Sequence, residues 1–257
     1  MRDAGRVRRW LRARAAGVAA VLPVLVAWEV VGRAGLLPAV PPPSRVAAAG
    51  VALAARGQLW QDGLRTLAAL AAGFALAAAC GLVLGVLMGR FRTVDAVCGL
   101  YVDLFQSTPA AAKVPVLVLL FGLGRASIVA TVFLFAFFVI TVNTYAGVRT
   151  ASPRLIEMAR SFGAGEAVLL RRVILPAALP MIFAGLRLGI GRAVNGAVLG
   201  EMLISIVGIG GLLMYYGGAF RADAVLALVL LIVAVAGVLM GAVGMLERRV
   251  VRWAGRG

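Results

Sequence analysis

Long apolar stretches separated by short charged segments are the dominant pattern of this 257-residue chain. Such stretches recur at about 15–31, 66–88, 97–120, 128–148, 178–203 and 225–246. Each is close to the roughly 20 apolar residues that a helix needs to cross a bilayer. The pattern therefore predicts an all-α, polytopic membrane protein with six transmembrane helices. Pro109 and Pro115 are expected to interrupt the third of them.

The first apolar stretch follows an Arg-rich start, a combination that a secretory signal peptide also shows. Its apolar core is long, contains Pro23 and Glu29, and lacks a clear cleavage site of small residues. We therefore predict a retained helix. The Pro-rich segment 38–44 cannot continue that helix. Ser44 is then predicted to cap a short interfacial helix that runs to Arg56.

The distribution of positive charge predicts the orientation of the helices. The chain has 26 Lys and Arg residues against 10 Asp and Glu residues, a net charge of +16. With the N-terminus inside, the inner segments hold about three times as many basic residues as the outer ones, in agreement with the positive-inside rule. The excess charge therefore requires no nucleic-acid partner. We expect a multi-pass membrane protein with both termini in the cytoplasm.

Three regions follow from this topology. Residues 1–65 are predicted to contain a cytoplasmic tail, the first transmembrane helix and an external interfacial segment. Residues 66–247 are predicted to form the transmembrane domain, which includes a polar cytoplasmic loop at 149–177. Residues 248–257 are predicted to form a basic cytoplasmic tail.

The composition excludes most kinds of enzyme. Hydrophobic residues make up 63% of the chain, charged residues 14%, and the mean hydropathy is +1.02. The absence of His removes His-based catalysis and His metal ligands. The only Lys, Lys113, is followed by Val114, so the chain has no G-x-x-x-x-G-K-[ST] phosphate-binding loop. We expect a chain without an ATPase site, bound cofactor or metal of its own.

Small residues at a spacing of four predict closely packed helices. The second apolar stretch has Gly81, Gly85 and Gly89, and the fifth has the pairs 185/189 and 196/200. Within a membrane, small residues at this spacing allow two backbones to approach each other. With 32 Gly in the chain, some of these matches are expected by chance.

The polar segment 149–177 carries the most specific pattern. Ser152 and Pro153 mark the start of a helix, because they fit its N-cap and its first position. Gly163 is expected to end that helix, and Glu166–Val173 is predicted as a second short helix. The segment therefore forms a helix–turn–helix across the cytoplasmic face.

The exit from this segment and its apolar side chains leave two interpretations open. Pro176 and Pro180 are expected to break the path into the fifth transmembrane helix. Glu157 is expected to pair with Arg160 or Arg171, a surface contact of only about 0–1 kcal/mol. The exposed apolar residues either connect the loop to the base of the bundle or form a docking surface; they are Phe162, Ala164, Val168 and Leu169.

The same segment resembles a loop of known transporters. The segment contains Glu157-Met158-Ala159, then Gly163, then nine residues, then Val173-Ile174-Leu175-Pro176. This spacing resembles the E-A-A---G---------I-x-L-P loop. That loop is typical of permease subunits of binding-protein-dependent ABC importers of the type I class. Met158 and Val173 are mild departures from the pattern.

The resemblance extends over about residues 41–247 and is most similar to the nitrate/sulfonate/taurine group. The further matching motifs are Pro41–Val46, Gly73-Phe74 with Gly81 and Gly85, Pro109 with Ala112 and Pro115, Phe121–Gly124, Gly185–Gly189, Glu201–Leu203 and Gly208–Gly210. Two departures from the family pattern change the charge near the pathway, and such charge helps to select the solute. Ala69 stands where the family often has Arg, and Lys113 stands where it usually has an apolar residue.

The resemblance implies a MetI-like bundle and a division of labour between subunits. Two copies of the chain would form the pathway, an extracytoplasmic binding protein would deliver the solute, and a cytoplasmic ATPase subunit would use ATP and Mg. The resemblance also implies that the pair lies in the lipid bilayer of the bacterial plasma (inner) membrane and that nucleic acid has no part. The residues that the resemblance assigns to ATPase coupling are Glu157, Ala159, Gly163, Ala164, Glu166, Leu175 and Pro176.

Charged residues within the spans are candidates for the translocation pathway, because such residues usually face the bundle interior or a wet cavity. Arg192 and Asn195 are three apart and share a helix face. One of the two Arg residues of this span, Arg187 or Arg192, is expected either to bond to Thr141 or Asn143, to pair with Glu201, or to line the pathway. Glu201 and the predicted turn 208–211 are expected near the outer gate or the contact with the binding protein.

Lys113 has three open interpretations. It is seven residues from Gln106, on the same face if the third helix continues past Pro109. It would then pair with Asp103, snorkel outward, or contact an anionic solute such as a sulfonate, carboxylate or nitrate.

We expect a transport subunit for a small, anionic solute such as a sulfonate, taurine or nitrate. The first alternative is an ion-coupled secondary carrier or channel, for which inverted repeats or an acidic relay would be expected. Neither is evident in the sequence. The second alternative is a membrane scaffold that docks a cytoplasmic protein without transporting anything.

Overall fold

The computed structural model describes residues 22–35, 39–204 and 207–251, and these residues contain helices and no strand. A helical segment at 22–33 is followed by the elements α2 (Pro43–Ala54), α3 (Gly57–Arg90), α4 (Arg92–Ser107), α5 (Ala110–Phe121), α6 (Arg125–Arg149), α7 (Pro153–Ser161), α8 (Glu166–Leu169), a π-helical turn (Leu170–Ile174), α9 (Leu175–Ile204), α10 (Gly208–Gly218) and α11 (Ala222–Val250).

Four helices of this part of the chain are long and apolar enough to cross a membrane. They are α3, α6, the continuous helix Glu166–Ile204 and α11. The pair α4 and α5 would count as a fifth span, but its two helices meet at an angle of 108°. The all-α polytopic prediction is confirmed. Of the predicted first span, 15–31, residues 15–21 lie outside the described residues, and residues 22–31 belong to the helical segment 22–33.

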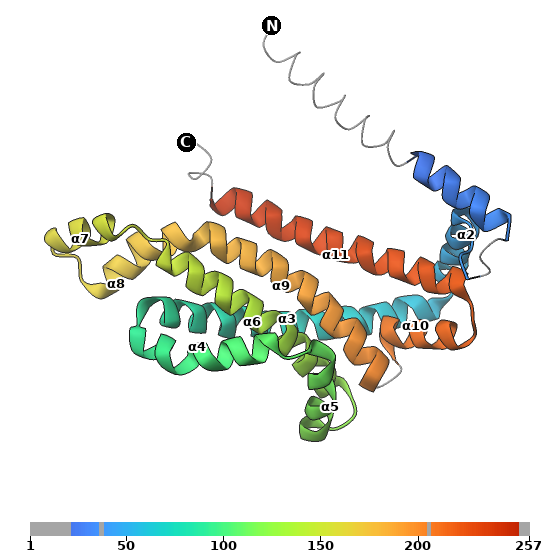
Figure 1. The fold of residues 1–257 in the computed structure, drawn as a ribbon, viewed down its shortest axis with the longest axis horizontal. Helices are drawn as coiled ribbons and strands as arrows, with labels where there is room; N and C mark the ends of the chain where they lie inside the picture. The colour runs from blue at the N-terminus through green and yellow to red at the C-terminus, as the bar shows by residue number, and fades with distance from the viewer. Residues whose placement is uncertain (1–21, 36–38, 205–206, 252–257) are drawn as a thin grey trace, which may run out of the picture.

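The centre of the bundle is α6, which lies between α3 and α9 (Figure 1). Small residues on both neighbours make this contact close. A Cβ atom on Gly73, Gly85 or Gly89 of α3 would lie 2.6 Å from an atom of α6, and one on Gly185 or Gly189 of α9 would lie 2.7 Å from one. The predicted close packing at small residues is therefore confirmed.

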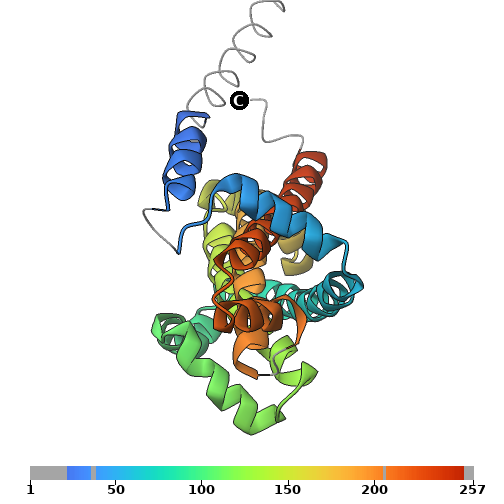
Figure 2. The same cartoon turned by 90° about the vertical axis from the view of Figure 1, so that its right-hand side faces the viewer.

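The two ends of the bundle carry different elements. The α7–α8 segment lies at the left of Figure 1, together with the turn from α3 to α4, and α2 and α10 lie at the right. Bonds between distant residues confirm this arrangement. Arg90 pairs with Glu166 at one end, and Arg56 donates to the Tyr216 hydroxyl at 3.4 Å at the other. Figure 2 views the molecule from the α10 end.

The predicted role of Ser44 is wrong. The helix α2 begins at Pro43, because proline fits the first turn of a helix at no hydrogen-bonding cost. Its N-cap is Pro42. The Ser44 hydroxyl instead donates to Glu29 Oε1 at 2.7 Å, and its backbone N–H donates to Glu29 Oε2 at 3.0 Å. Ser44 thus ties α2 to the helical segment 22–33.

The effects of the prolines differ from one another. Pro109 breaks the third span as predicted, whereas Pro115 lies inside α5. Pro176 and Pro180 do not break the path into the fifth span, so that prediction is wrong; both lie inside α9. The π-helical turn immediately before Pro176 changes the hydrogen-bond spacing, with the Leu175 N–H donating to the Leu170 carbonyl. The chain can therefore pass Pro176 without losing its helix.

We predict that Gly85→Ala destabilises the bundle and that Gly241→Ala does not. The new methyl group at residue 85 would lie 2.6 Å from the Thr141 carbonyl oxygen, whereas a Cβ at residue 241 meets nothing within 4 Å. Overpacking of this kind costs about 1–3 kcal/mol. The measurement is the thermal midpoint of the purified protein in detergent. Equal midpoints for both variants would contradict close packing of α3 on α6.

Candidate functional site

The first candidate site is the α7–α8 hairpin, residues 153–169. Ser152 is the N-cap of α7 and Pro153 its first residue, as predicted, although the Ser152 hydroxyl makes no capping bond. Gly163 follows the end of α7 with φ +77°, a left-handed conformation that side chains disfavour. The Gly163 and Ala164 N–H groups donate to the carbonyls of Arg160 and Ala159 at 2.9 and 3.0 Å. Gly163 thus reverses the chain.

The hairpin buries one apolar face and exposes another. Leu169 and Ile174 are buried against Val148 and Ala178 at the end of the bundle. Phe162 at the tip is 84% exposed, and the other exposed apolar side chains are Leu155, Met158 and Val168. The expectation that Leu169 is exposed is therefore wrong: the inner face of the segment packs on the bundle, and the outer face is exposed.

Ion pairs fix the angle of the hairpin, but not the predicted ones. The carboxylate of Glu166 accepts hydrogen bonds from Arg90 of α3 and, at 3.1 Å, from Arg160 of α7. Among the described residues, the Glu157 side chain forms no ion pair, so its expected pairing with Arg160 or Arg171 is wrong. Glu157 is exposed instead.

The remaining residues assigned to coupling are half-buried. Ala159 lies on α7, Ala164 lies in the turn after Gly163, and Leu175 and Pro176 lie at the start of α9. Because α8, the π-helical turn and α9 form one continuous helix, the hairpin is joined directly to the helix that packs against α6.

The second candidate site is the set of polar residues on α9. Arg187 pairs with Glu247 of α11. Thr141 and Asn143 donate to carbonyls of their own helix, at Phe137 and Val139. Among the described residues, neither Arg187 nor Arg192 bonds to these side chains or to Glu201, so that alternative is wrong.

Arg192 and Asn195 share one face of α9, as predicted, and both are exposed in the single chain. The face also carries Leu188, which is exposed as well. A cation and an amide on an apolar span need water or a polar partner. This face therefore fits a wet pathway or a contact with another subunit.

Lys113 lies at the bend between α4 and α5. Its ammonium donates to the Phe105 carbonyl and lies 5.7 Å from the centre of the Phe138 ring. In a continuous helix the Phe105 carbonyl would accept from residue 109, but Pro109 has no N–H. Lys113 supplies the missing donor. The third helix does not continue past Pro109, and the expected pairing with Asp103 is wrong.

Glu201 joins α9 to the start of α10. Its side chain is buried, and its Oε2 accepts the Gly210 N–H at 2.9 Å. The Ile209 N–H donates to Thr66 Oγ1 of α3 at 3.0 Å. Both N–H groups lie in the first turn of a helix, where no carbonyl of the same helix can accept them. Residues 208–211 are thus the start of a helix, and not only the predicted turn.

Gly208 completes this junction. It has φ +77°, and any side chain at residue 208 would collide with the Glu201 carboxylate. Glu201 of α9 therefore braces the start of α10, as Thr66 of α3 does, and its carboxylate is not open to a solute in this structure.

The sequence did not identify three partners that shape these sites: Arg90, Glu247 and Thr66. Each pairs across more than 50 residues of sequence, as the separations of 76, 60 and 143 residues show. Short motifs carry no signal for such pairs. Among the described residues, no group of three or more His, Cys, Asp or Glu side chains is placed to hold a metal ion.

We predict that Glu201→Leu loosens α10, whereas Glu201→Gln does not. Leucine leaves the buried Gly210 N–H without an acceptor, which costs about 1–3 kcal/mol, and glutamine keeps an acceptor oxygen. Amide hydrogen exchange of residues 207–211 should be about 10- to 100-fold faster in the leucine variant. Identical exchange in both variants would contradict the bracing role.

Comparisons with known proteins place this architecture in a family. The family described as "Binding-protein-dependent transport system inner membrane component" matches residues 81–252. The riboflavin transport system permease protein of Chloroflexus aurantiacus is 34% identical over 232 residues, which cover 90% of this chain and 87% of that protein. The taurine transport system permease protein of Escherichia coli is 32% identical over 197 residues, which cover 77% and 72%.

A solved structure shows the same fold. The MetNI methionine ABC transporter in inward-facing conformations superimposes with a TM-score of 0.62 at 22% identity, over 73% of this chain and 93% of that chain. The chain therefore belongs to the family of inner-membrane components of binding-protein-dependent transport systems and is a permease subunit of a type I ABC importer.

Proposed function

We propose that two copies of this chain form the pathway of an ATP-driven importer for a small anionic solute, and that the α7–α8 hairpin couples it to a cytoplasmic ATPase subunit. An extracytoplasmic binding protein delivers the solute, and both termini lie in the cytoplasm. The observation that carries the proposal is an exposed apolar hairpin built directly onto the helix that packs at the centre of the bundle.

The outer face of the hairpin fits a protein partner. Phe162 is 84% exposed at the tip, beyond the charged residues that the topology places at the cytoplasmic surface. An aromatic side chain that enters a pocket of its partner is the usual anchor of an interface. Arg160 and Glu166 beside it supply a polar rim.

The connection to the bundle allows movement to be transmitted. A force on the hairpin acts on α9 without an intervening loop, because Glu166–Ile204 is one continuous helix. The Arg90–Glu166 pair also ties the hairpin to α3. Movement of the ATPase subunit would therefore reach α9 and α3 together, and through Glu201 and Thr66 it would reach α10.

The face of α9 with Arg192 and Asn195 is the proposed contact with the solute pathway. In a pair of chains, an exposed polar face on an apolar span is favoured next to a water-filled path. Arg192 there would attract an anion. The taurine relative supports a sulfonate, while the riboflavin relative widens the class. Lys113 and Arg187 hold the bend and α11 in this structure, so we assign the solute contact to Arg192 and Asn195 first.

We predict that Gly163→Ala uncouples the ATPase, whereas Gly165→Ala does not. Neither added methyl group meets an atom within 4 Å, but Gly163 has φ +77° and Gly165 has φ −70°. Only the first variant is strained, by about 1–2 kcal/mol. The measurement is the ATPase activity that co-purifies with the tagged permease in mild detergent.

Loss of co-purified activity in Gly163→Ala alone supports the proposal. If no ATPase associates with the folded wild-type chain, the coupling proposal fails. Solute uptake that continues after ATP depletion would favour an ion-coupled carrier, and an ATPase-binding chain without any uptake would favour a scaffold.

We predict that Arg192→Gln lowers anion uptake about 10- to 100-fold, the loss expected from one charge-assisted hydrogen bond of about 1.5–3 kcal/mol. Arg192→Lys should retain most of the uptake. The assay compares uptake of labelled taurine, an alkanesulfonate, nitrate and riboflavin, with co-purified ATPase activity as the control for assembly. Unchanged anion uptake in Arg192→Gln would contradict the assigned role.

A further inference from the structure

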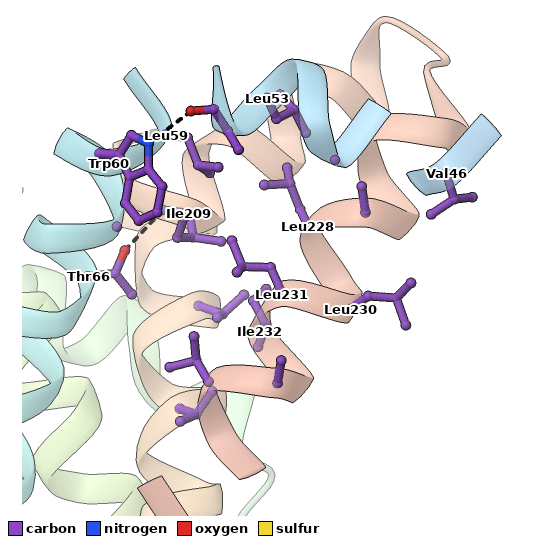
Figure 3. A pocket seen from close by; sticks show the side chains of 18 of the residues that line it. Val46, Leu53, Leu59, Trp60, Thr66, Ile209, Leu228, Leu230, Leu231 and Ile232 are labelled. Carbon is purple, nitrogen blue, oxygen red and sulfur yellow. Dashed lines mark hydrogen bonds between the residues drawn. The ribbon is translucent and has the colours of Figure 1, made fainter. Parts of the chain in front are cut away.

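A groove at the outer end of the bundle has a volume of about 750 Å³. It lies between the helical segment 22–33, α2, α3, α9, α10 and α11 (Figure 3). We propose that this groove binds an acyl chain of an anionic phospholipid. The proposal concerns a site outside the solute pathway and does not depend on the proposed function.

The lining of the groove is almost entirely hydrocarbon. Figure 3 shows Leu53 and Leu59 near one edge and Leu228 and Leu231 on α11. Apart from Trp28, Trp60 and Thr66, every lining residue is aliphatic, Gly or Pro.

The three polar side chains of the lining have their hydrogen bonds satisfied. Trp28 and Trp60 donate to the carbonyls of Pro41 and Ala54 at 3.0 and 2.9 Å. Thr66 donates to the Asp62 carbonyl and accepts from Ile209. A polar ligand would therefore lose its bonds to water without gaining others, and only an apolar occupant is favoured.

The size and position of the groove fit a lipid tail. Its lining on α11 extends from Ala227 to Val235, about 12 Å along a helix. The helix α11 is peripheral, with only 11% of its apolar window buried inside the chain. A tail could therefore enter from the bilayer, and Trp60, which is 64% exposed at the rim, is typical of the membrane–water interface.

Two basic residues at the rim of the groove favour one kind of lipid headgroup. Arg45 and Arg56 lie at the two ends of α2, next to lining residues, and both are exposed. Among the described residues neither forms an ion pair; the guanidinium of Arg56 only reaches the Tyr216 hydroxyl. Basic residues at the membrane surface favour anionic headgroups. The charge on the rim thus favours an anionic lipid over a zwitterionic one.

The test is native mass spectrometry of the delipidated permease titrated with dioleoyl-phosphatidylglycerol or dioleoyl-phosphatidylcholine. Ala234→Phe fills the groove, because Ala234 is a lining residue, whereas the adjacent and exposed Val233 is not. Displacing even two methylene groups should weaken phosphatidylglycerol binding about tenfold. Val233→Phe is the matched control and should bind as the wild type does.

A second pair of variants tests the headgroup. The double variant Arg45→Gln/Arg56→Gln should bind phosphatidylglycerol about 25-fold more weakly, about fivefold for each basic residue near the surface, with phosphatidylcholine binding unchanged. Arg125→Gln, on an exposed Arg that does not belong to the groove, should change neither. Thermal midpoints confirm that each variant folds.

Three results would overturn the proposal. The first is unchanged phosphatidylglycerol binding in Ala234→Phe. The second is equal binding of the two lipids by the wild type. The third is dissociation of an assembled pair by Ala234→Phe, since the groove would then be an interface between copies.

Discussion

The close contact of α3 and α9 with α6 is the constraint on which the rest of the structure depends. In a bilayer, apolar side chains gain little by leaving the lipid, so helices associate through packing at short distance. The small residues of α3 and α9 provide that distance, because a Cβ at Gly85 or Gly189 would lie within 2.6–2.7 Å of an atom of α6. The three helices therefore form one unit.

Polar contacts at the two ends extend this unit. At one end Glu166 of α8 pairs with Arg90, which joins the hairpin to α3, and with Arg160 of α7, which lies within the hairpin. At the other end Glu201 and Thr66 accept the first N–H groups of α10. The contacts of Arg90, Glu201 and Thr66 each connect a peripheral element to the central three helices, and the rigid part of the molecule thus reaches from the α7–α8 hairpin to α10.

The sequence predicted those features that depend on local pattern. Apolar length gave the spans of α3, α6, α9 and α11, and Gly163 was correctly placed at the turn, because its left-handed φ leaves few alternatives. The wrong predictions concerned the effect of prolines on the helices and the ion-pair partners of charged residues. Pro176 was expected to break the helix, but a π-helical turn absorbs it. Partners such as Glu247 for Arg187 lie too far apart in sequence for any motif to predict.

The most direct test of this account is a distance measurement along one chain. Spin labels at Phe162→Cys and Tyr215→Cys, in a background without Cys80 and Cys98 and with one labelled copy in each pair, report on the hairpin and α10. The account predicts that pulsed electron paramagnetic resonance gives the same distance with and without ATP. In a second sample, with Phe162→Cys labelled in both copies, the distance between the two labels should change. A change within the labelled chain as large as the change between copies would contradict it.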